Sequence, residues 1–121
     1  MITQTILDQI YPLIRNLLVD KVKYGAVGTD NATPQVTDTQ LGNEVFREEL
    51  YSITVDDSSK EISAVMWLDI TEANGHVLKE FGIFDSSTDG DMVLREVFPD
   101  LEKNEYKEVI IEAVLKIEIT Q

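Results

Sequence analysis

Cysteine is absent from this sequence of 121 residues, histidine occurs once, and ten basic residues stand against 23 acidic ones. Without cysteine the chain has no disulfide, no thiol nucleophile and no thiolate ligand for zinc or an iron–sulfur cluster. The one histidine, His76, follows the turn sequence Asn74-Gly75, and nothing in the sequence pairs it with a nucleophilic serine or threonine. Because zinc sites usually combine several histidines or cysteines, we expect neither a zinc centre nor catalysis at His76.

Positive charge is scarce, and the acidic excess gives a net charge of −13 and a pI near 4.2. Nucleic-acid backbones and anionic membranes are bound by clustered lysine and arginine, so neither is an expected partner. Asp8, Arg15 and Asp20 interrupt the first twenty residues, which therefore predict neither a secretory signal nor a membrane span. With 43% hydrophobic residues, residues 1–121 are expected to form one folded domain.

The N-terminal segment has the period of an amphipathic helix. Apolar residues recur at steps of three and four between Thr3 and Lys21, which places them on one broad face. They are Ile6, Leu7, Ile10, Tyr11, Ile14, Leu17 and Leu18. Pro12 has no backbone donor, so we expect a kink or a second helix start at this position.

A second, short helix is predicted over residues 38–49. Thr37 and Gln40 have the spacing of a capping box, in which each side chain accepts the other's unpaired backbone N–H. Its buried face would consist of Leu41, Val45 and Phe46. A short strand over 23–28 and a loop over 29–34 are expected before it.

From Tyr51 onward apolar and polar residues alternate, which is the period of a β-strand. The alternation predicts strands over 51–55, 62–70, 77–85, 92–98 and 109–119, with a loop over 99–106. The Asn74-Gly75 pair is typical of a tight turn with two positive-φ residues, so we expect a meander, with the last strand in a central position. The expected fold class is α+β: an antiparallel sheet or sandwich meander with an N-terminal helix and a second short helix.

Apolar residues also occupy the opposite face of two of these strands, at Val65, Trp67, Ile110 and Val114. This pattern predicts a sheet that is partly covered on both faces. Two kinds of cover fit the pattern. One is a helix or second sheet of the same chain, and the other is an interface between copies.

Oxygen-bearing side chains gather over residues 85–96 at the spacing of an EF-hand calcium loop, with Gly90 at the bend. The candidate ligands are Asp85, Ser87, Asp89, Asp91 and Glu96. An EF-hand requires flanking helices, and both flanks here predict strands. A polar hairpin turn accounts for the same residues, and a calcium site is the alternative.

Acid–base catalysis has no clear candidate. Glycosidase-type catalysis needs two carboxylates in a cleft with separated pKa values, and the acidic pairs at 48–49 and 56–57 fall on predicted turns or an exposed helix end. Glu80 lies in an otherwise apolar strand, where we expect it to face solvent. We therefore expect a protein that is not an enzyme.

Two stretches of the sequence combine into one pattern. The first runs from Gly25 to Pro34 (GAVGTDNATP) and continues from Asp38 to Arg47 (DTQLGNEVFR); the second is Glu80 to Asp85 (EFGIFD), followed by Gly90 and Arg95. In order and spacing they resemble the small tail-fibre and tail-collar domains of tailed phages. That family carries a Gly-Thr-Gly loop with a downstream proline, then Asp-Thr-x-Leu-x-x-Glu-Val-x-Arg, and later Glu-x-Gly-Leu-Phe-Asp before a glycine turn and an arginine.

The resemblance implies a structural protein of the virion, in the tail of a tailed phage or a related archaeal tailed virus (Caudoviricetes). It implies a homo-oligomer, most often a trimer, that docks to other tail or baseplate proteins and needs no cofactor. The sequence departs from the family pattern at Asp30, which replaces the second loop glycine. Tail-fibre proteins continue into long shafts whereas this chain stops at Gln121, so we expect an attachment-type domain at a baseplate, tail tip or fibre junction.

A different class stays open: a free acidic binding module, either calcium-dependent or presenting carboxylates to a basic partner. Such a module requires a spatial cluster of carboxylates. The sequence instead distributes them over turns, loops and both predicted helices.

An even spread of carboxylates with only seven lysines is typical of proteins that face concentrated salt, and we hypothesise a virus of a halophilic host. Because salt screens repulsion between like charges, we expect the melting temperature to fall as sodium chloride is lowered from about 2 M to about 10 mM. Circular dichroism measures this transition. An unchanged melting temperature across the series would contradict the hypothesis.

Overall fold

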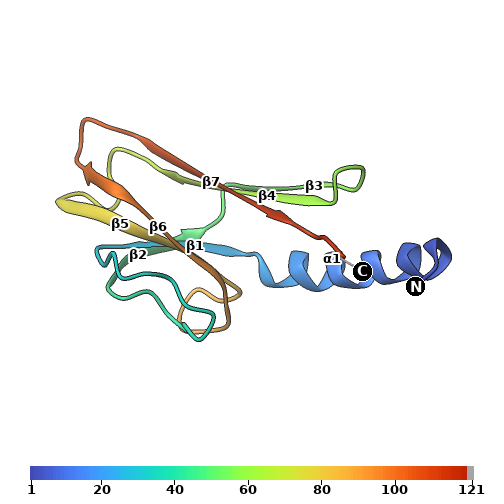
Figure 1. The fold of residues 1–121 in the computed structure, drawn as a ribbon. Coiled ribbons are helices and arrows are strands. Elements are labelled where there is room, and N and C mark those ends of the chain that lie inside the picture. Colours follow the sequence, from blue (N-terminus) through green and yellow to red (C-terminus); the bar gives the residue numbers. More distant parts are fainter. Residues whose placement is uncertain (120–121) are drawn as a thin grey trace.

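The computed structural model describes residues 1–119, which form one N-terminal helix and seven strands in two antiparallel sheets (Figure 1). The elements are α1 (Gln4–Lys21), β1 (Tyr24–Gly28), β2 (Glu44–Glu49), β3 (Ser52–Asp56), β4 (Glu61–Leu68), β5 (His76–Phe84), β6 (Met92–Lys103) and β7 (Val109–Lys116). The first sheet has the strand order β2-β1-β5-β6, and the second has the order β3-β4-β7. The chain is therefore mostly β, with one helix.

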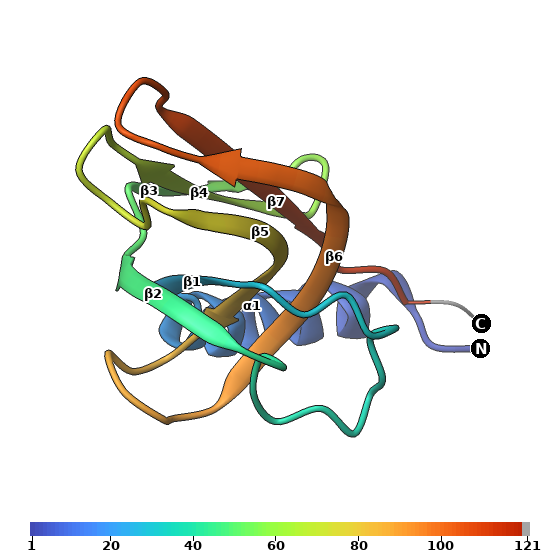
Figure 2. The ribbon, with the colours of Figure 1, turned by 90° about the vertical axis from the view of Figure 1, so that its left-hand side faces the viewer.

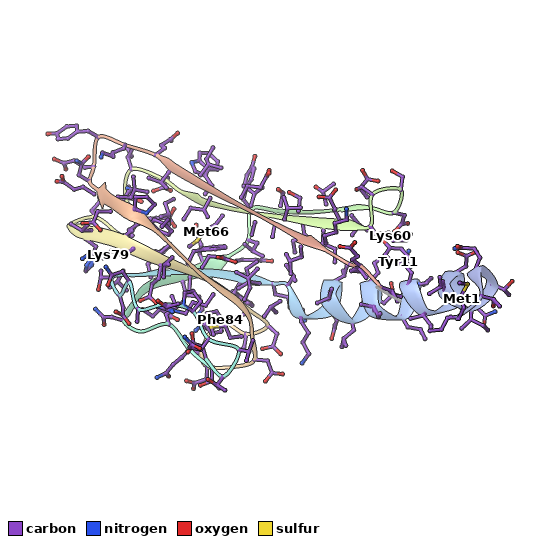
Figure 3. All side chains as sticks on the ribbon, in the orientation of Figure 1. Met1, Tyr11, Lys60, Met66, Lys79 and Phe84 are labelled. Carbon is purple, nitrogen blue, oxygen red and sulfur yellow. The ribbon has the colours of Figure 1, made fainter. Side chains whose placement is uncertain are left out.

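The two sheets pack face to face, and the main core lies between them (Figure 2). Along β4 every second side chain is buried, which gives the alternation expected of a strand with one face inward. Met66 of β4 projects into this layer (Figure 3), and Phe81 and Ile83 reach it from β5. Gly25 allows the sheets to approach closely at this point, since a Cβ there would lie 2.9 Å from the sulfur of Met66.

The first sheet is buried on its outer face as well. β1 and β5 contain unbroken runs of buried residues, which is the pattern of strands covered on both sides. The outer cover is the segment 29–43, whose Leu41 packs against Ala26 and Phe84. This segment has no helix or strand of its own, so its position depends on contacts with the sheet.

The predicted N-terminal helix is confirmed, and it continues through Pro12 as one element. α1 passes beneath the end of the second sheet near the β3–β4 turn, and its first turns extend beyond the sheet (Figures 1 and 3). The Tyr11 hydroxyl donates to Asp57 Oδ1 over 2.9 Å, and Arg15 lies 3.1 Å from the same oxygen. Lys21, at the other end of the helix, reaches Asp85 and Asp91. Within residues 1–119, no helix has the length and apolarity needed to cross a membrane.

The prediction of a second helix over residues 38–49 is wrong. Its second half is β2, which pairs with β1, and its first half belongs to the covering segment. The backbone N–H groups of Gly42 and Asn43 donate to the carboxylate of Glu80, so they are not available for helical hydrogen bonds. Pairing with the edge of β1 and this side-chain acceptor together outweigh a local capping pattern.

The predicted meander is also wrong, although the β3–β4 and β5–β6 hairpins are confirmed. β4 and β5 do not pair; they lie in different sheets, and residues 69–75 connect the two layers. In this connection the positive-φ residues are Ala73 and Gly75 rather than Asn74 and Gly75. The last strand, predicted to be central, is at an edge, because β7 pairs with β4 alone.

The loop predicted over 99–106 begins later than expected, because β6 continues to Lys103. The pairing of β5 with β6 shifts register between Leu78 and Glu80, whose partners are Leu101 and Val97. Pro99 falls within this bulge, where a residue without a backbone N–H does not break a ladder hydrogen bond. The bulge therefore lets the strand pass through a proline.

Within residues 1–119, no segment supplies the predicted same-chain cover for the outer face of the second sheet. Trp67, Ile110 and Val114 remain 38%, 70% and 52% exposed. The helix and the first sheet both lie on the inner side of this sheet (Figure 1). Each sheet thus covers the inner face of the other, whereas the outer face of the second sheet remains exposed.

Candidate functional site

The residues that carry the sequence pattern meet on the outer face of the first sheet. Alternation along β5 directs Phe81 and Ile83 into the core and leaves Glu80, Gly82 and Phe84 facing the segment 29–43. Gly82 makes room for the covering segment, since a Cβ there would lie 2.8 Å from Leu41. The short motif therefore supplies a core face and a loop-binding face in one strand.

Glu80 anchors the two ends of the covering segment. Its Oε2 accepts the backbone N–H groups of Asp30 at 3.0 Å and Asn43 at 2.8 Å, and its Oε1 accepts that of Gly42 at 2.8 Å. The expectation that Glu80 faces solvent is wrong, because its side chain is completely buried. One carboxylate thus closes a segment of more than a dozen residues into a loop.

Arg95 completes the anchor from β6. Its Nε donates to Glu80 Oε1 over 2.9 Å, and Nη1 donates to the carbonyl oxygen of Ala32 over 2.8 Å. The same guanidinium reaches the carboxylate of Asp38 at 3.4 Å and the carbonyl of Asp30 at 3.4 Å. Arg95 therefore binds the loop at Asp30 and Ala32, near its start, and at Asp38. It also binds Glu80, the carboxylate that holds both ends of the loop.

The environment of Glu80 favours its ionised form. Burial alone would raise the pKa of this carboxyl, but hydrogen bonds from the Asn43 and Gly42 backbones, from Arg95 and from the Asp30 backbone lower it below the ordinary value. A buried ion pair of this kind tolerates the loss of neither partner, because the other charge is then left without compensation. The loop conformation and the ionisation of Glu80 depend on each other.

Gly28 and Asp30 explain how the loop leaves the sheet. A Cβ at Gly28 would collide with the Glu80 carboxylate and with the carbonyl of Asn43, so this position admits glycine alone without displacement. Asp30 stands where the resembling family has a second glycine, and its side chain accepts the N–H of Ala32 to form a local turn. The Asp30 side chain thus supplies a local turn where the loop leaves the sheet.

A second clasp holds the β5–β6 turn against β2. The guanidinium of Arg47 lies 3.7 Å from the centre of the Phe84 ring, and its Nη1 donates to the carbonyl oxygens of Ser86 and Asp89 at 2.9 Å each. Glu44 holds the other side of the same guanidinium. Both arginines of the sequence pattern therefore fix loops by donating to backbone carbonyls.

The candidate calcium ligands Asp85, Ser87, Asp89, Asp91 and Glu96 fall on the β5–β6 turn and the start of β6. Between the first and fourth of them the structure places a side-chain cation, since Lys21 Nζ lies 3.1 Å from Asp85 and 3.0 Å from Asp91. The pKa of Asp85 is lowered by the backbone N–H of Asp91 and by Lys21. In the described part of the chain, no three histidine or acidic side chains are grouped as a metal site.

Four carboxylates that the sequence scatters do gather at one place. A small pocket beside Tyr51 and Trp67, whose rings meet edge to face at 5.2 Å, is lined by acidic side chains. They are Glu48, Glu49, Asp69 and Glu72. Burial, a hydrogen bond with Glu72 and the charges of Glu72 and Asp69 raise the pKa of Glu48 to about 8. The group cannot be recognised in the sequence, because its members come from β2 and from the connection between the sheets.

His76 is the first residue of β5 and pairs with Lys103 across the sheet. Lys103 is fully buried, and its ammonium donates to Asn74 Oδ1 at 2.8 Å and to the carbonyl of Asn104 at 3.1 Å. These bonds tie the connection between the sheets to the end of β6. The region around His76 is thus a structural junction between the connection 69–75 and the end of β6.

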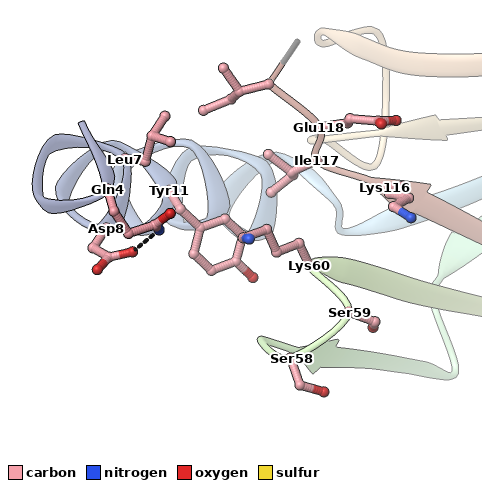
Figure 4. Close-up of a pocket in the computed structure, with 11 residues that line it drawn as sticks. Gln4, Leu7, Asp8, Tyr11, Ser58, Ser59, Lys60, Lys116, Ile117 and Glu118 are labelled. Carbon is pink, nitrogen blue, oxygen red and sulfur yellow. Dashed lines mark hydrogen bonds between the residues drawn. The ribbon is translucent and has the colours of Figure 1, made fainter. Parts of the chain in front are cut away.

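A pocket of about 410 Å³ lies between α1, the β3–β4 turn and the end of β7 (Figure 4). Tyr11 and Lys60 line it side by side, and Gln4 donates to Asp8 along the helix at 2.7 Å. Leu7 and Ile117 form its apolar part. The polar side chains around it come from α1, from the β3–β4 turn and from the end of β7.

Comparison with known proteins gives no relatives: neither a protein-family model nor a curated protein sequence matches the chain.

Replacing Glu80 with glutamine should release the covering loop, because the variant keeps the shape of the side chain but leaves Arg95 without its buried counter-charge. We expect the free energy of unfolding to fall by about 3 kcal/mol and the amide protons of Gly42 and Asn43 to exchange faster. Chemical denaturation and hydrogen–deuterium exchange measure the two effects.

The contribution of Glu80 to stability should also depend on pH, and a second variant serves as the control. The pKa of Glu80 is lowered in the fold, so its contribution is complete above the ordinary value of 4.5 and is lost as pH falls through the folded pKa. Glu96→Gln, on the exposed side of β6, should change stability by less than about 0.5 kcal/mol. Equal stability of Glu80→Gln and wild type at pH 7 would contradict the anchor.

The raised pKa of Glu48 predicts the opposite pH dependence. The folded state holds a proton on Glu48 that the unfolded state releases, so stability should fall between the ordinary value of 4.5 and about 8. Glu48→Gln imitates the protonated form and should reduce this loss, raising the melting temperature at pH 8.5 by about 5 °C relative to wild type and leaving it nearly unchanged at pH 5.

Thermal melts at both pH values provide the measurement. The control is Glu102→Gln, an exposed acidic position on β6, which should show no such pH-dependent difference. A gain of the same size for both variants would mean that general acidity, rather than the Glu48 site, sets the pH dependence.

Proposed function

We propose that this chain is a non-enzymatic structural subunit of a viral tail, an attachment-type domain that docks to copies of itself and to other tail or baseplate proteins. The observation that carries the proposal is the meeting of the pattern residues. Glu80, Arg95 and the segment from Asp30 to Asn43 are far apart in sequence and form one buried network. A resemblance carried by interlocked residues supports a shared architecture better than the same letters would if they were scattered.

The network also suits a docking role. Five donated hydrogen bonds from Arg95 and to Glu80, at 3.0 Å or less, fix the base of the loop. The loop meanwhile presents Val36 to solvent with its side chain fully exposed. Because a loop held in place loses less conformational entropy on association than a free one, a fixed loop with an apolar tip favours protein–protein contact.

A second candidate function, a free acidic binding module, is favoured by the carboxylate group beside Trp67. Four acidic residues on one side of an exposed aromatic pair offer a basic segment both charge and a cation–π surface. The raised pKa of Glu48 weakens this attraction near neutral pH, since that carboxyl is protonated there. The tail proposal does not use this group.

Immunogold electron microscopy of tailed particles from the source culture tests the proposal. An antibody raised against the purified chain should label the tail, and preincubation of the antibody with the purified chain should remove the label. Mass spectrometry of gradient-purified particles provides the independent measurement. Particles that lack the chain would contradict the proposal, and recovery of the chain only in the particle-free fraction would favour the acidic binding module.

A further inference from the structure

The helix α1 carries two parallel apolar stripes, and only one of them packs on the rest of the chain. The first stripe is buried or half-buried and consists of Leu7, Tyr11, Ile14 and Leu18, of which Leu7 and Tyr11 lie beside the β3–β4 turn and the end of β7. The second stripe consists of Ile6, Ile10, Leu13 and Leu17. Ile10 is half-buried, whereas Ile6, Leu13 and Leu17 are 45%, 71% and 60% exposed.

The exposed stripe has the geometry of a helix–helix seam. Its residues follow one another at steps of four, three and four, which is the spacing of the core positions in packed helices. On the side away from the chain's own body the seam is bordered by Gln9 and Asn16, which carry no charge, and by Asp20 at its C-terminal end. Four large aliphatic side chains in this register form a surface suited to another helix with the same register.

The distribution of charge along the chain indicates which partner packs on this stripe. The segment 1–21 contains two acidic and two basic side chains, so the net charge of −13 belongs entirely to the remainder of the chain. Two copies repel each other wherever their acidic surfaces meet, and the helix is the place where this repulsion is least. A basic partner, by contrast, would be drawn to the acidic body, because a neutral stripe offers it no electrostatic gain.

We infer that the stripe Ile6–Ile10–Leu13–Leu17 is the self-association surface of this protein, and that the α1 helices of neighbouring copies pack against one another through it. The first turns of α1 extend past the edge of the second sheet, so a second helix reaches them without meeting the acidic strands (Figure 1). The inference rests on the proposed function in one respect, that a tail subunit assembles with copies of itself. It adds the surface through which this occurs.

Sedimentation equilibrium of the full chain tests the inference. Wild type should associate between about 1 µM and about 1 mM, in salt high enough to screen the acidic body. Leu13→Glu places a charge in the centre of the seam and should weaken association by at least about 100-fold. The matched control is Val19→Glu, which adds the same charge to another side of the same helix and should associate as wild type does.

Each outcome of this experiment either supports or overturns self-association through the stripe. Circular dichroism should show equal helix content in both variants, because Leu13 and Val19 are exposed; Leu13→Gln, which adds no charge, serves as the second variant if Leu13→Glu loses helix. A wild type that stays monomeric at the highest concentration overturns the inference, whatever labelling of particles shows. So does association that survives Leu13→Glu. Unlabelled particles with a self-associating chain would overturn the proposed function and leave this inference standing.

Discussion

The buried pair of Glu80 and Arg95 is the constraint on which the arrangement of the first sheet depends. Removing two charges from water is costly, and here that cost is offset because three backbone N–H groups of one loop donate to the carboxylate and two of its carbonyl oxygens accept from the guanidinium. The loop in turn covers the outer face of β1 and β5, which explains why these strands are buried on both sides. The pair therefore selects one loop conformation rather than adding stability in general.

The second layer of organisation is the way in which α1 is fastened. Tyr11 and Arg15 hold its middle to Asp57, and Lys21 holds its end to two aspartates of the β5–β6 turn. These contacts leave Ile6, Leu13 and Leu17 of the neighbouring apolar stripe exposed within residues 1–119. A helix fixed in direction and open on one side is well arranged for association, because little orientational freedom remains to be lost.

Acidity has three different roles in this protein, and they are distinguished by environment. Most carboxylates are solvated on turns and strand surfaces, where they add to the net charge. Glu80 is buried among donors, so the pKa of its carboxyl is lowered. Glu48 is partly buried beside another carboxyl, so its pKa is raised to about 8. The pKa values of these two glutamates thus shift in opposite directions, because hydrogen-bond donors surround Glu80 whereas another carboxyl faces the partly buried Glu48.

Sequence alone determined the features set by local periodicity: the helix over 4–21, the β3–β4 and β5–β6 hairpins, and the absence of cysteine chemistry. Only the tertiary structure decided which strands are neighbours, that residues 44–49 form a strand, and that Glu80 is buried. The physical reason is that these outcomes depend on partners distant in sequence. A capping pattern at Thr37 is worth about 1 kcal/mol, whereas an open strand edge and a buried carboxylate each demand several backbone donors. The same reason explains why the carboxylates beside Trp67 could not be grouped from the sequence, since β2 and the connection 69–75 bring them together only in the fold.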